Sequence, residues 1–448
     1  MATREQFSSK TGFVMAAAGS AIGLGNIWGF PTQTATNGGA AFVLVYLVLA
    51  FLLAYPALMA ELIIGRHARA NVVTALRGIA TNPFTYKLGS FVGFYGVIVA
   101  ALILSFYGIV AGWMLAYLLD AITHVFSISV MDGWLTEFGL QRNLIFMSVF
   151  MLFTMGIIAK GVTSGIEKWS TRLMPLLIIL MLVLIVYVLL QKGAVAGLKV
   201  YLLPDVTQIN MALILSAMGQ AFFSLSLGVG TMLIYGSYLS EKENLPTLGA
   251  AVTLVDVAMA FIAGLLIIPA IYVAKEYGAS IFGADGQLIA GPDLIFQVLP
   301  VLFESMGGVG ALVGLAFFLL MSIAALTSSI SMLEVPVSLV AEETSASRKQ
   351  ATLIVGLAVL LVSCCVVFNF DSLFEFVVDL TTVYSQPMLG VMLCIFVGWI
   401  WHSNHLLAEL KLGNEAIENS FFWKVWPFYV RFFCPILIVA AFVQSLNS

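Results

Sequence analysis

Two short polar segments interrupt otherwise apolar stretches of this chain. The first spans residues 19–26 and reads GSAIGLGN, and the second spans residues 223–230 and reads FSLSLGVG. Glycine weakens a helix interior by about 1 kcal/mol relative to alanine, so both segments predict breaks in helical geometry. A broken helix presents N–H and carbonyl groups that can bind an anion or a cation. In a membrane, such breaks are tolerated only where those groups find partners or line a cavity.

Two acidic side chains also fall inside apolar stretches. Asp256 lies in the sequence TLVDVAMA, and Glu61 lies in the sequence ALMAELII. A carboxylate at membrane depth is costly and marks a functional site by default. Asp256 is therefore a candidate functional residue, and a carboxylate paired with a neighbour for structure is the alternative. For Glu61 we expect a supporting role, in which it accepts hydrogen bonds from the broken backbone of the first helix.

Apolar helices must carry these residues. The 448 residues are 61% hydrophobic and only 9% charged, whereas a soluble domain is about 25% charged. A membrane-spanning helix needs roughly 20 apolar residues, and the chain offers about eleven such stretches. The sequence therefore predicts an all-α integral membrane protein in which residues 1–448 form a single transmembrane domain. The stretches lie near residues 12–36, 41–64, 89–122, 143–160, 170–191, 211–238, 246–274, 308–340, 350–368, 374–401 and 425–446.

Lysine and arginine are distributed unevenly between the segments that join these stretches. With the N-terminus inside, the outer segments hold only four of the 19 lysine and arginine residues, namely Arg142, Lys192, Lys199 and Lys275. Cytoplasmic loops carry this kind of excess positive charge. We therefore expect a multi-pass protein of the plasma (cytoplasmic) membrane, with a cytoplasmic N-terminus and an extracytoplasmic C-terminus.

The two interrupted segments belong to the first and the sixth of these stretches. Either segment alone would fit close helix packing through small residues. Two of them, five helices apart, favour an inverted 5+5 repeat with broken first and sixth helices and a binding site between them. The repeats would cover approximately residues 5–192 and 208–402, and an extra C-terminal helix would cover approximately residues 425–446.

Four motifs of the chain resemble the neurotransmitter:sodium symporter family, in particular its prokaryotic amino-acid transporters with the leucine-transporter-like fold. They are residues 19–31 (GSAIGLGNIWGFP), 61–66 (ELIIGR), 219–228 (GQAFFSLSLG) and 326–329 (LTSS). The resemblance extends from Arg4 to about Trp401. It implies sodium-coupled symport of a small neutral amino acid by alternating access, and no enzymatic activity.

The resemblance places a substrate site between the two breaks. The Tyr107 hydroxyl and the N–H groups around Leu24 and Gly25, at the positive end of a half-helix, would bind a carboxylate. Carbonyl and hydroxyl oxygens of the broken segments would bind the amine. For the apolar members of the site, ordinary core packing is the alternative. The expected substrate-binding residues are Ser20, Ala21, Gly23, Leu24, Gly25, Ile103, Tyr107, Phe223, Ser224, Ser226, Val229, Ser328 and Met332.

The resemblance also implies two sodium ions as coupling ions, held by oxygen ligands, and no other cofactor. The first site would share the substrate carboxylate, so that ion and substrate would strengthen each other's binding reciprocally. Its protein ligands would be Ala21, Asn26, Ser224 and Asp256. The second site would join the first helix to the eighth, and its ligands would be Gly19, Ile22, Ala324, Thr327 and Ser328.

Two positions separate this chain from other branches of the family. Gly23 stands where biogenic-amine transporters carry an aspartate, so a substrate that brings its own carboxylate is favoured, and the apolar lining favours a hydrophobic side chain. Chloride-dependent relatives have asparagine at the position of Asp256 and serine at that of Ala260. We therefore expect chloride-independent transport, with Asp256 supplying the negative charge.

Gate residues follow from the same resemblance. Arg4 and Glu342, with Tyr238 nearby, match an inner gate, and Asp379 matches an outer gating acid. The usual arginine partner of that acid is replaced by Gly29. The outer salt bridge is therefore expected to be missing, or another residue replaces it.

Other functions compete with this interpretation. A proton-coupled amino-acid symporter would rely on Asp256 or Glu61, and a sodium-coupled carrier of another zwitterion would use the same helices. A transporter-like sensor would bind the same ligand without moving it. A channel would show pore loops or charged rings, and an enzyme would need a nucleophile with its base or a metal cluster; the sequence has neither pattern. Sodium, the amino acid and the lipid bilayer are the expected partners, with no nucleic acid, and the sequence indicates no oligomeric state.

Overall fold

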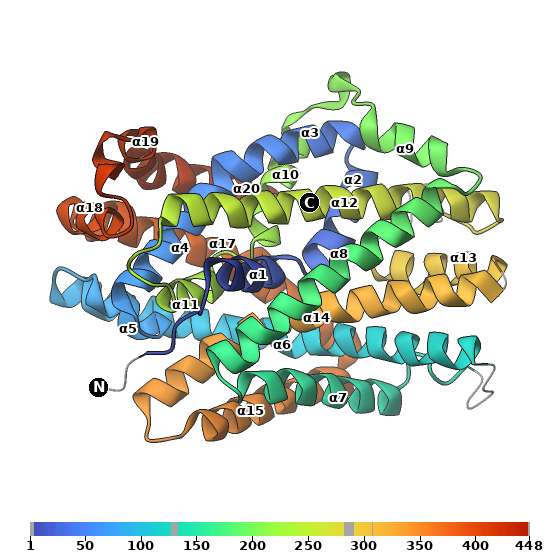
Figure 1. Ribbon diagram of the computed structural model, residues 1–448, viewed down its shortest axis with the longest axis horizontal. Helices are drawn as coiled ribbons and strands as arrows, with labels where there is room; N and C mark the ends of the chain where they lie inside the picture. Colours follow the sequence, from blue (N-terminus) through green and yellow to red (C-terminus); the bar gives the residue numbers. More distant parts are fainter. Residues whose placement is uncertain (1–3, 127–132, 282–290, 307, 447–448) are drawn as a thin grey trace.

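The computed structural model describes residues 4–126, 133–281, 291–306 and 308–446. These residues form helices joined by short loops, and none of them lies in a strand. Most of the long helices run side by side along the longest dimension of the molecule (Figure 1). The all-helical architecture expected from the composition is therefore confirmed.

The bounds of the elements follow the chain in two parts, with η marking segments of π- or 3₁₀-helix. Residues 10–237 form α1 (Lys10–Ala21), η1 (Gly25–Gly29), α2 (Phe30–Thr36), α3 (Ala40–Leu49), η2 (Ala50–Ala54), α4 (Tyr55–Ala68), α5 (Val72–Gly78), α6 (Pro83–Val125), α7 (Leu140–Ile158), η3 (Val162–Glu167), α8 (Lys168–Leu189), α9 (Ala194–Leu202), η4 (Val206–Gln208), α10 (Met211–Ser224) and α11 (Thr231–Ser237). Residues 245–445 form α12 (Leu245–Glu276), η5 (Leu294–Val298), α13 (Leu299–Ser305), α14 (Gly308–Glu343), α15 (Arg348–Phe368), α16 (Phe370–Val378), η6 (Asp379–Ser385), α17 (Gln386–Ile395), η7 (Phe396–Ile400), α18 (Ser403–Lys411), η8 (Glu415–Asn419), α19 (Phe421–Phe428), η9 (Tyr429–Phe433) and α20 (Cys434–Ser445).

Within the described residues, 9 continuous helices are long and apolar enough to cross a membrane. The bent pair formed by Lys10–Ala21 and Gly25–Thr36 makes a tenth span. The stretch predicted at residues 211–238 is divided between α10, with 14 residues, and α11, with 7 residues, so neither is long enough alone. Large apolar side chains such as Leu361 and Leu152, which are 67% and 64% exposed, lie on the outside of the helices. In water such a surface would be costly, so we assign it to contact with lipid.

Both predicted helix breaks are present. The axis turns by 55° between α1 and the helix that begins at Gly25. The second break has three residues with positive φ, namely Ser226 at 52°, Gly228 at 90° and Gly230 at 81°. A Cβ at Gly228 would collide with the carbonyl oxygen of Gln386, so only glycine fits there. The backbone conformation of this break thus explains why glycine occurs in it.

Glu61 has a supporting role, but the prediction that it holds the first broken helix is wrong. Its two carboxylate oxygens accept hydrogen bonds from the N–H groups of Gly228 (2.6 Å) and Leu233 (3.2 Å), which belong to the second break and to α11. The reason is the close packing of α4 on α11. A Cβ at Gly236 would lie only 2.7 Å from the carbonyl oxygen of Leu62, so the backbones meet through glycine and bring Glu61 to the second break.

A buried ion pair joins α4 to α18 near the end of the molecule that holds the N-terminus (Figure 1). The Arg66 side chain is fully buried, and its Nε donates to Glu409 Oε1 at 2.6 Å. His67 Nδ1 lies 3.1 Å from the other oxygen of Glu409. Burial raises the pKa of Glu409, but the hydrogen bond to His67 and the charge of Arg66 outweigh it and hold the pKa below its ordinary value.

Glu409→Gln is expected to lower the melting temperature at pH 7, because it leaves the buried charge of Arg66 without its partner, at a cost of about 3 kcal/mol. A carboxyl whose pKa is lower in the folded state stabilises the fold above its unfolded pKa, and this stabilisation is lost as the pH falls through the folded pKa. The difference between variant and unmodified protein should therefore shrink on acidification, as measured by thermal melts. Glu418→Gln, which removes an exposed pair with Lys411, is the control, and equal shifts in the two variants would contradict the assignment.

Candidate functional site

The two helix breaks lie against each other. Gln220, near the end of α10, donates a hydrogen bond from Nε2 to the carbonyl oxygen of Gly25 at 2.9 Å. Ser226 Oγ in the second break donates to the carbonyl oxygen of Ser20 at 3.4 Å. Ser328 on α14 also donates to the carbonyl oxygen of Ser20, at 3.1 Å. Residues from α1, α10 and α14 that are far apart in the sequence therefore meet at one place, as the motifs predict.

The end of η1 that faces the break is suited to a carboxylate. The positive end of the helix dipole lies at the start of η1, where the N–H groups of Asn26 and Ile27 both donate to the carbonyl oxygen of Gly23 at 3.3 Å. The Tyr107 hydroxyl is buried and has no hydrogen-bond partner among the described residues. A Cβ at Gly23 would lie 3.0 Å from this hydroxyl and would collide with Ser328 Oγ. An unpaired donor thus lies over Gly23, beside the positive end of η1.

Three of the predicted apolar residues are buried. Ile103, Val229 and Met332 are 6%, 2% and 7% exposed. Phe223 is 39% exposed, and its ring would lie 3.1 Å from a Cβ at Gly25. Phe223 therefore covers the start of η1 and is still accessible from the side opposite to Gly25. This is the position of a lid over the break.

Ser20 contributes to the region differently from the other predicted substrate residues. Its hydroxyl donates to Ser331 Oγ at 2.6 Å, so its side chain is occupied by a partner that the motifs did not indicate. Its carbonyl oxygen accepts from Ser226 and Ser328. Ala21 uses its carbonyl oxygen to accept from the N–H of Gly23 at 2.9 Å.

Asn26, Ser224 and Asp256 form one hydrogen-bonded cluster, each of them at most 1% exposed. Asn26 Nδ2 donates to Asp256 Oδ1 at 2.7 Å, and Ser224 Oγ lies 2.9 Å from Asp256 Oδ2. No lysine, arginine or histidine of the described residues forms an ion pair with Asp256. A buried carboxylate without a cationic partner is unfavourable, so the cluster is suited to a bound cation held by oxygen atoms.

A second group of oxygens joins α1 to α14. Ser328 Oγ donates to the carbonyl oxygen of Gly19 at 3.2 Å, and Thr327 Oγ1 donates to that of Ala324 at 3.1 Å. A Cβ at Gly19 would lie 3.1 Å from the Cβ of Thr327, so glycine permits the close approach. Ile22, which follows the last residue of α1, leaves helical geometry with ψ at 81°. Of the five residues expected at the second ion site, Gly19, Thr327 and Ser328 therefore lie at the contact of these two helices.

The predicted inner-gate residues lie together at the N-terminal end of the molecule. Arg4 forms an ion pair with Glu342, donates to Ser237 Oγ at 2.7 Å and lies 4.7 Å from the centre of the Tyr238 ring. The N–H of Phe7 donates to the carbonyl oxygen of Tyr238 at 3.1 Å. These contacts join the N-terminal segment to the ends of α11 and α14.

Two further residues extend the inner network. The hydroxyl of Tyr238 donates to Glu334 Oε1 at 2.5 Å, and Arg348 Nη2 lies 2.6 Å from Glu334 Oε2. Glu334 is fully buried. The motifs indicate no role for Glu334, because its partner Arg348 lies on the next helix, beyond a loop.

Glu342→Gln is expected to loosen the N-terminal segment, since it removes the charge that pairs with Arg4. A partly exposed pair contributes up to about 1 kcal/mol, which corresponds to roughly fivefold faster exchange of the protected amide of Phe7 with deuterium. Glu343→Gln is the matched control, because Glu343 accepts from Thr74 Oγ1 at 2.7 Å and forms no ion pair with described residues. Equal exchange in both variants would show that the pair does not hold this segment.

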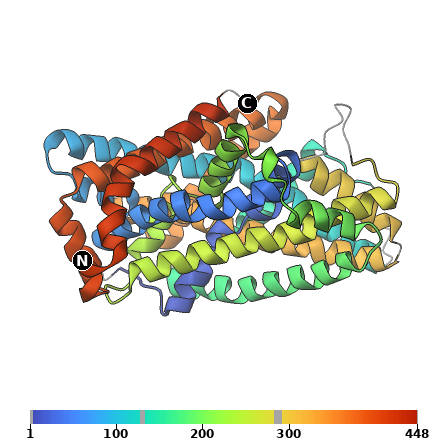
Figure 2. The same ribbon diagram turned by 90° about the horizontal axis from the view of Figure 1, so that it is seen from above.

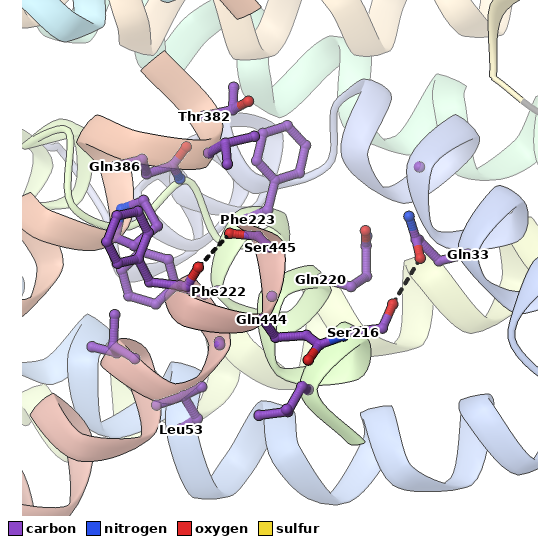
Figure 3. A pocket seen from close by; sticks show the side chains of 18 of the residues that line it. Gln33, Leu53, Ser216, Gln220, Phe222, Phe223, Thr382, Gln386, Gln444 and Ser445 are labelled. Atoms are coloured by element: carbon purple, nitrogen blue, oxygen red, sulfur yellow. Dashed lines mark hydrogen bonds between the residues drawn. The ribbon is translucent and has the colours of Figure 1, made fainter. Parts of the chain in front are cut away.

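The predicted outer gating acid has no such partner among the described residues. Asp379, at the start of η6, is exposed and forms no ion pair with any described residue. Gly29 instead lines a cavity of about 610 Å³ between α2, α10, η6 and α20 (Figure 3), whose lining residues carry no charge. The Phe223 ring also lines this cavity. The expectation that the outer salt bridge is missing agrees with this geometry.

The profile of the sodium:neurotransmitter symporter family matches residues 4–140 and 129–448. The chain belongs to this family. An uncharacterised sodium-dependent transporter of Bacillus subtilis is 35% identical over 99% of this chain and 98% of its own length. A sodium-dependent transporter of Haemophilus influenzae is 30% identical over 99% of this chain and 98% of its own length.

One solved structure supports the same assignment. MhsT in complex with L-phenylalanine is 37% identical, has a TM-score of 0.84, and aligns with 99% of this chain and 100% of its own. The protein is thus a sodium-dependent symporter of the sodium:neurotransmitter type, a multi-pass membrane protein in a family of transporters rather than enzymes. The family resemblance taken from the four motifs is confirmed.

For this symporter, one residue close to the first ion cluster was not indicated by the motifs. Tyr46 on α3 is fully buried and donates from its hydroxyl to Ser224 Oγ at 3.2 Å. A single tyrosine in an apolar stretch gives no signal that separates such a role from core packing. Gln220 was within a matched motif, but the motif gave no reason to single it out.

Proposed function

We propose that this symporter couples the entry of two sodium ions to uptake of a neutral amino acid with a hydrophobic side chain, without chloride, by alternating access. The observation that carries the proposal is the unpaired Tyr107 hydroxyl over Gly23, next to the positive end of η1. A carboxylate would accept a hydrogen bond from this hydroxyl, and an amine substrate without a carboxylate would leave the hydroxyl unpaired at a cost of about 1–3 kcal/mol.

The same geometry supports the coupling. Asn26 follows Gly25 directly in the chain, so a substrate carboxylate at the start of η1 would lie next to the Asn26–Ser224–Asp256 cluster. Asp256 would supply the negative charge that chloride provides elsewhere in the family. The second ion would bind between α1 and α14. That MhsT was solved with L-phenylalanine supports a neutral amino acid with an apolar side chain as the substrate.

Orientation and repeats complete the proposal. The positive charge of the N-terminal side supports an orientation in which Arg4 and Glu342 would lie in the cytoplasm and the cavity beside Gly29 would open on the outer face of the plasma membrane. The two broken helices would begin the two halves of an inverted repeat, at about residues 5–192 and 208–402. The closed inner end and the cavity outside Phe223 correspond to a conformation that receives substrate from outside.

Uptake into proteoliposomes tests the proposal. A labelled mixture of neutral amino acids is supplied with sodium or with choline outside, and gluconate replaces chloride throughout. Uptake that requires sodium is the expected result. Uptake that is indifferent to sodium would favour proton coupling, and no uptake by folded protein would favour a zwitterion other than an α-amino acid or a sensor that binds without transport.

A further inference from the structure

Three polar residues on α10 lie at successive intervals of four along one face of the helix. Residues that are four apart in an α-helix lie one above the other. Ser216 Oγ donates to Gln33 Oε1 at 2.8 Å, Gln220 Nε2 donates to the Gly25 carbonyl oxygen at 2.9 Å, and Ser224 Oγ donates to Asn26 Oδ1 at 2.9 Å. We call these three bonds the α10 ladder. Each of them joins α10 to the outer half of the first broken helix, η1 and α2.

The two ends of the α10 ladder have different surroundings. At one end Ser224 Oγ also lies 2.9 Å from Asp256 Oδ2 and belongs to the first ion cluster. At the other end Ser216 and Gln33 line the uncharged cavity, where their hydrogen bond is drawn in Figure 3. Gln220 lies between the two, is 7% exposed and also lines the cavity. The ladder therefore connects the proposed sodium site with the outer cavity.

Position 29 explains why Gln220 can occupy this place. A Cβ at Gly29 would lie 3.5 Å from Gln220 Oε1 and 3.8 Å from its Nε2. A Cβ alone would fit, but a longer side chain at position 29 would have to enter the space beside the Gln220 amide or the cavity. Position 29 carries no charged side chain, and Asp379 forms no ion pair with a described residue. Among the described residues, no ion pair therefore joins η1 or α2 to a neighbouring helix.

The carbonyl that Gln220 holds belongs to the peptide bond between Gly25 and Asn26. This peptide plane is rigid, so a hydrogen bond to its oxygen restrains the backbone from which the Asn26 side chain extends. Asn26 contacts both Ser224 and Asp256. A change at Gln220 would therefore reach the ion cluster through a single peptide unit, without any contact between Gln220 and the ion.

We propose that Gln220 is a positioning residue for the first sodium site, and that the α10 ladder takes the place of an outer ion pair by holding the two outer half-helices together. This inference rests on the proposed sodium coupling. By linkage, the bond that favours the bound arrangement of Asn26 raises sodium affinity, and sodium in turn strengthens the contact between η1 and α10.

Direct binding of sodium-22 to purified protein without substrate tests the inference, with choline keeping the ionic strength constant. Gln220→Met keeps the length of the side chain and removes the donor. The sodium concentration for half-saturation is expected to rise about tenfold, which is the change in affinity that the loss of one hydrogen bond to a carbonyl oxygen can cause. Gln444→Met is the matched control, since Gln444 lines the same cavity outside the α10 ladder, and it should shift half-saturation less than twofold. Gln220→Asn keeps the amide but shortens its reach, so it should behave as Gln220→Met does.

The readouts separate positioning from a general structural effect. At saturating sodium, the substrate Kd of Gln220→Met should stay within twofold of that of the unmodified protein. Sodium half-saturation that is unaltered in both Gln220 variants would overturn this inference alone. Failure of the unmodified protein to bind sodium would overturn the proposed function, and this inference with it.

Discussion

Asp256→Asn is expected to reduce sodium-dependent uptake in the absence of chloride by about 100-fold. Asp256 is 1% exposed and has no cationic partner among the described residues, so its charge is available to a bound cation. Loss of a buried charge from such a contact costs about 3 kcal/mol, which is about 100-fold in affinity. The measurement is the initial rate of uptake into proteoliposomes against sodium concentration, with gluconate as the only external anion.

Two further variants make this prediction specific. Asp293→Asn is the control, because Asp293 is exposed and its carboxylate accepts from Gln297 Nε2 at 2.6 Å, away from the cluster. Asp256→Asn combined with Ala260→Ser should recover uptake when chloride is added, since the family resemblance places a chloride ion beside a serine one turn further along α12. Undiminished uptake by Asp256→Asn without chloride would contradict the role given to this carboxylate.

Much of the site could be predicted because glycine and buried acid leave local signals. The second break needs positive φ at Gly228 and Gly230, and a cluster of glycine and serine in an apolar stretch shows this without any knowledge of the neighbours. Asp256 could be predicted as a functional residue in the same way, because a carboxylate in an apolar helix is costly. The oxygen ligands then followed from the motifs that surround these residues.

The partners of buried groups could not be predicted in the same way. Glu61 was expected beside the first broken helix, but the approach of α4 to α11 through Gly236 places it beside the second. That approach depends on the packing of helices that are far apart in the sequence. The role of Glu334 could not be predicted for the same reason, since its partners Tyr238 and Arg348 come from other helices.

Gly29 illustrates both cases. Glycine at this position of the motif indicates that the usual arginine is missing. The structure agrees, because Asp379 forms no ion pair with described residues. What occupies the space is Gln220, which comes from α10. A missing side chain can be recognised from a motif. The neighbour that takes its place depends on how α10 packs against the outer half of the first broken helix, within the bundle drawn in Figures 1 and 2.

Tyr107→Phe is expected to weaken binding of the amino acid by about 10- to 100-fold, the effect of losing one hydrogen bond to a charged group. The Tyr107 hydroxyl is buried and has no hydrogen-bond partner among the described residues, so removing it takes no bond from the substrate-free fold. The melting temperature without substrate should therefore stay the same or rise, while the Kd of the amino acid measured at saturating sodium increases. A change that weakens binding without weakening the fold is what a group reserved for the ligand would show.

Tyr117→Phe provides the contrast on the same helix. The hydroxyl of Tyr117 donates to the carbonyl oxygen of Phe296 at 3.0 Å, so its loss should lower the melting temperature and leave the Kd of the amino acid unchanged. If instead Tyr107→Phe destabilised the substrate-free protein and left the Kd unchanged, the carboxylate would have to bind elsewhere. The donors over Gly23 would then no longer distinguish an amino acid from an amine, and the argument for the substrate class would have to rest on Gly23 alone.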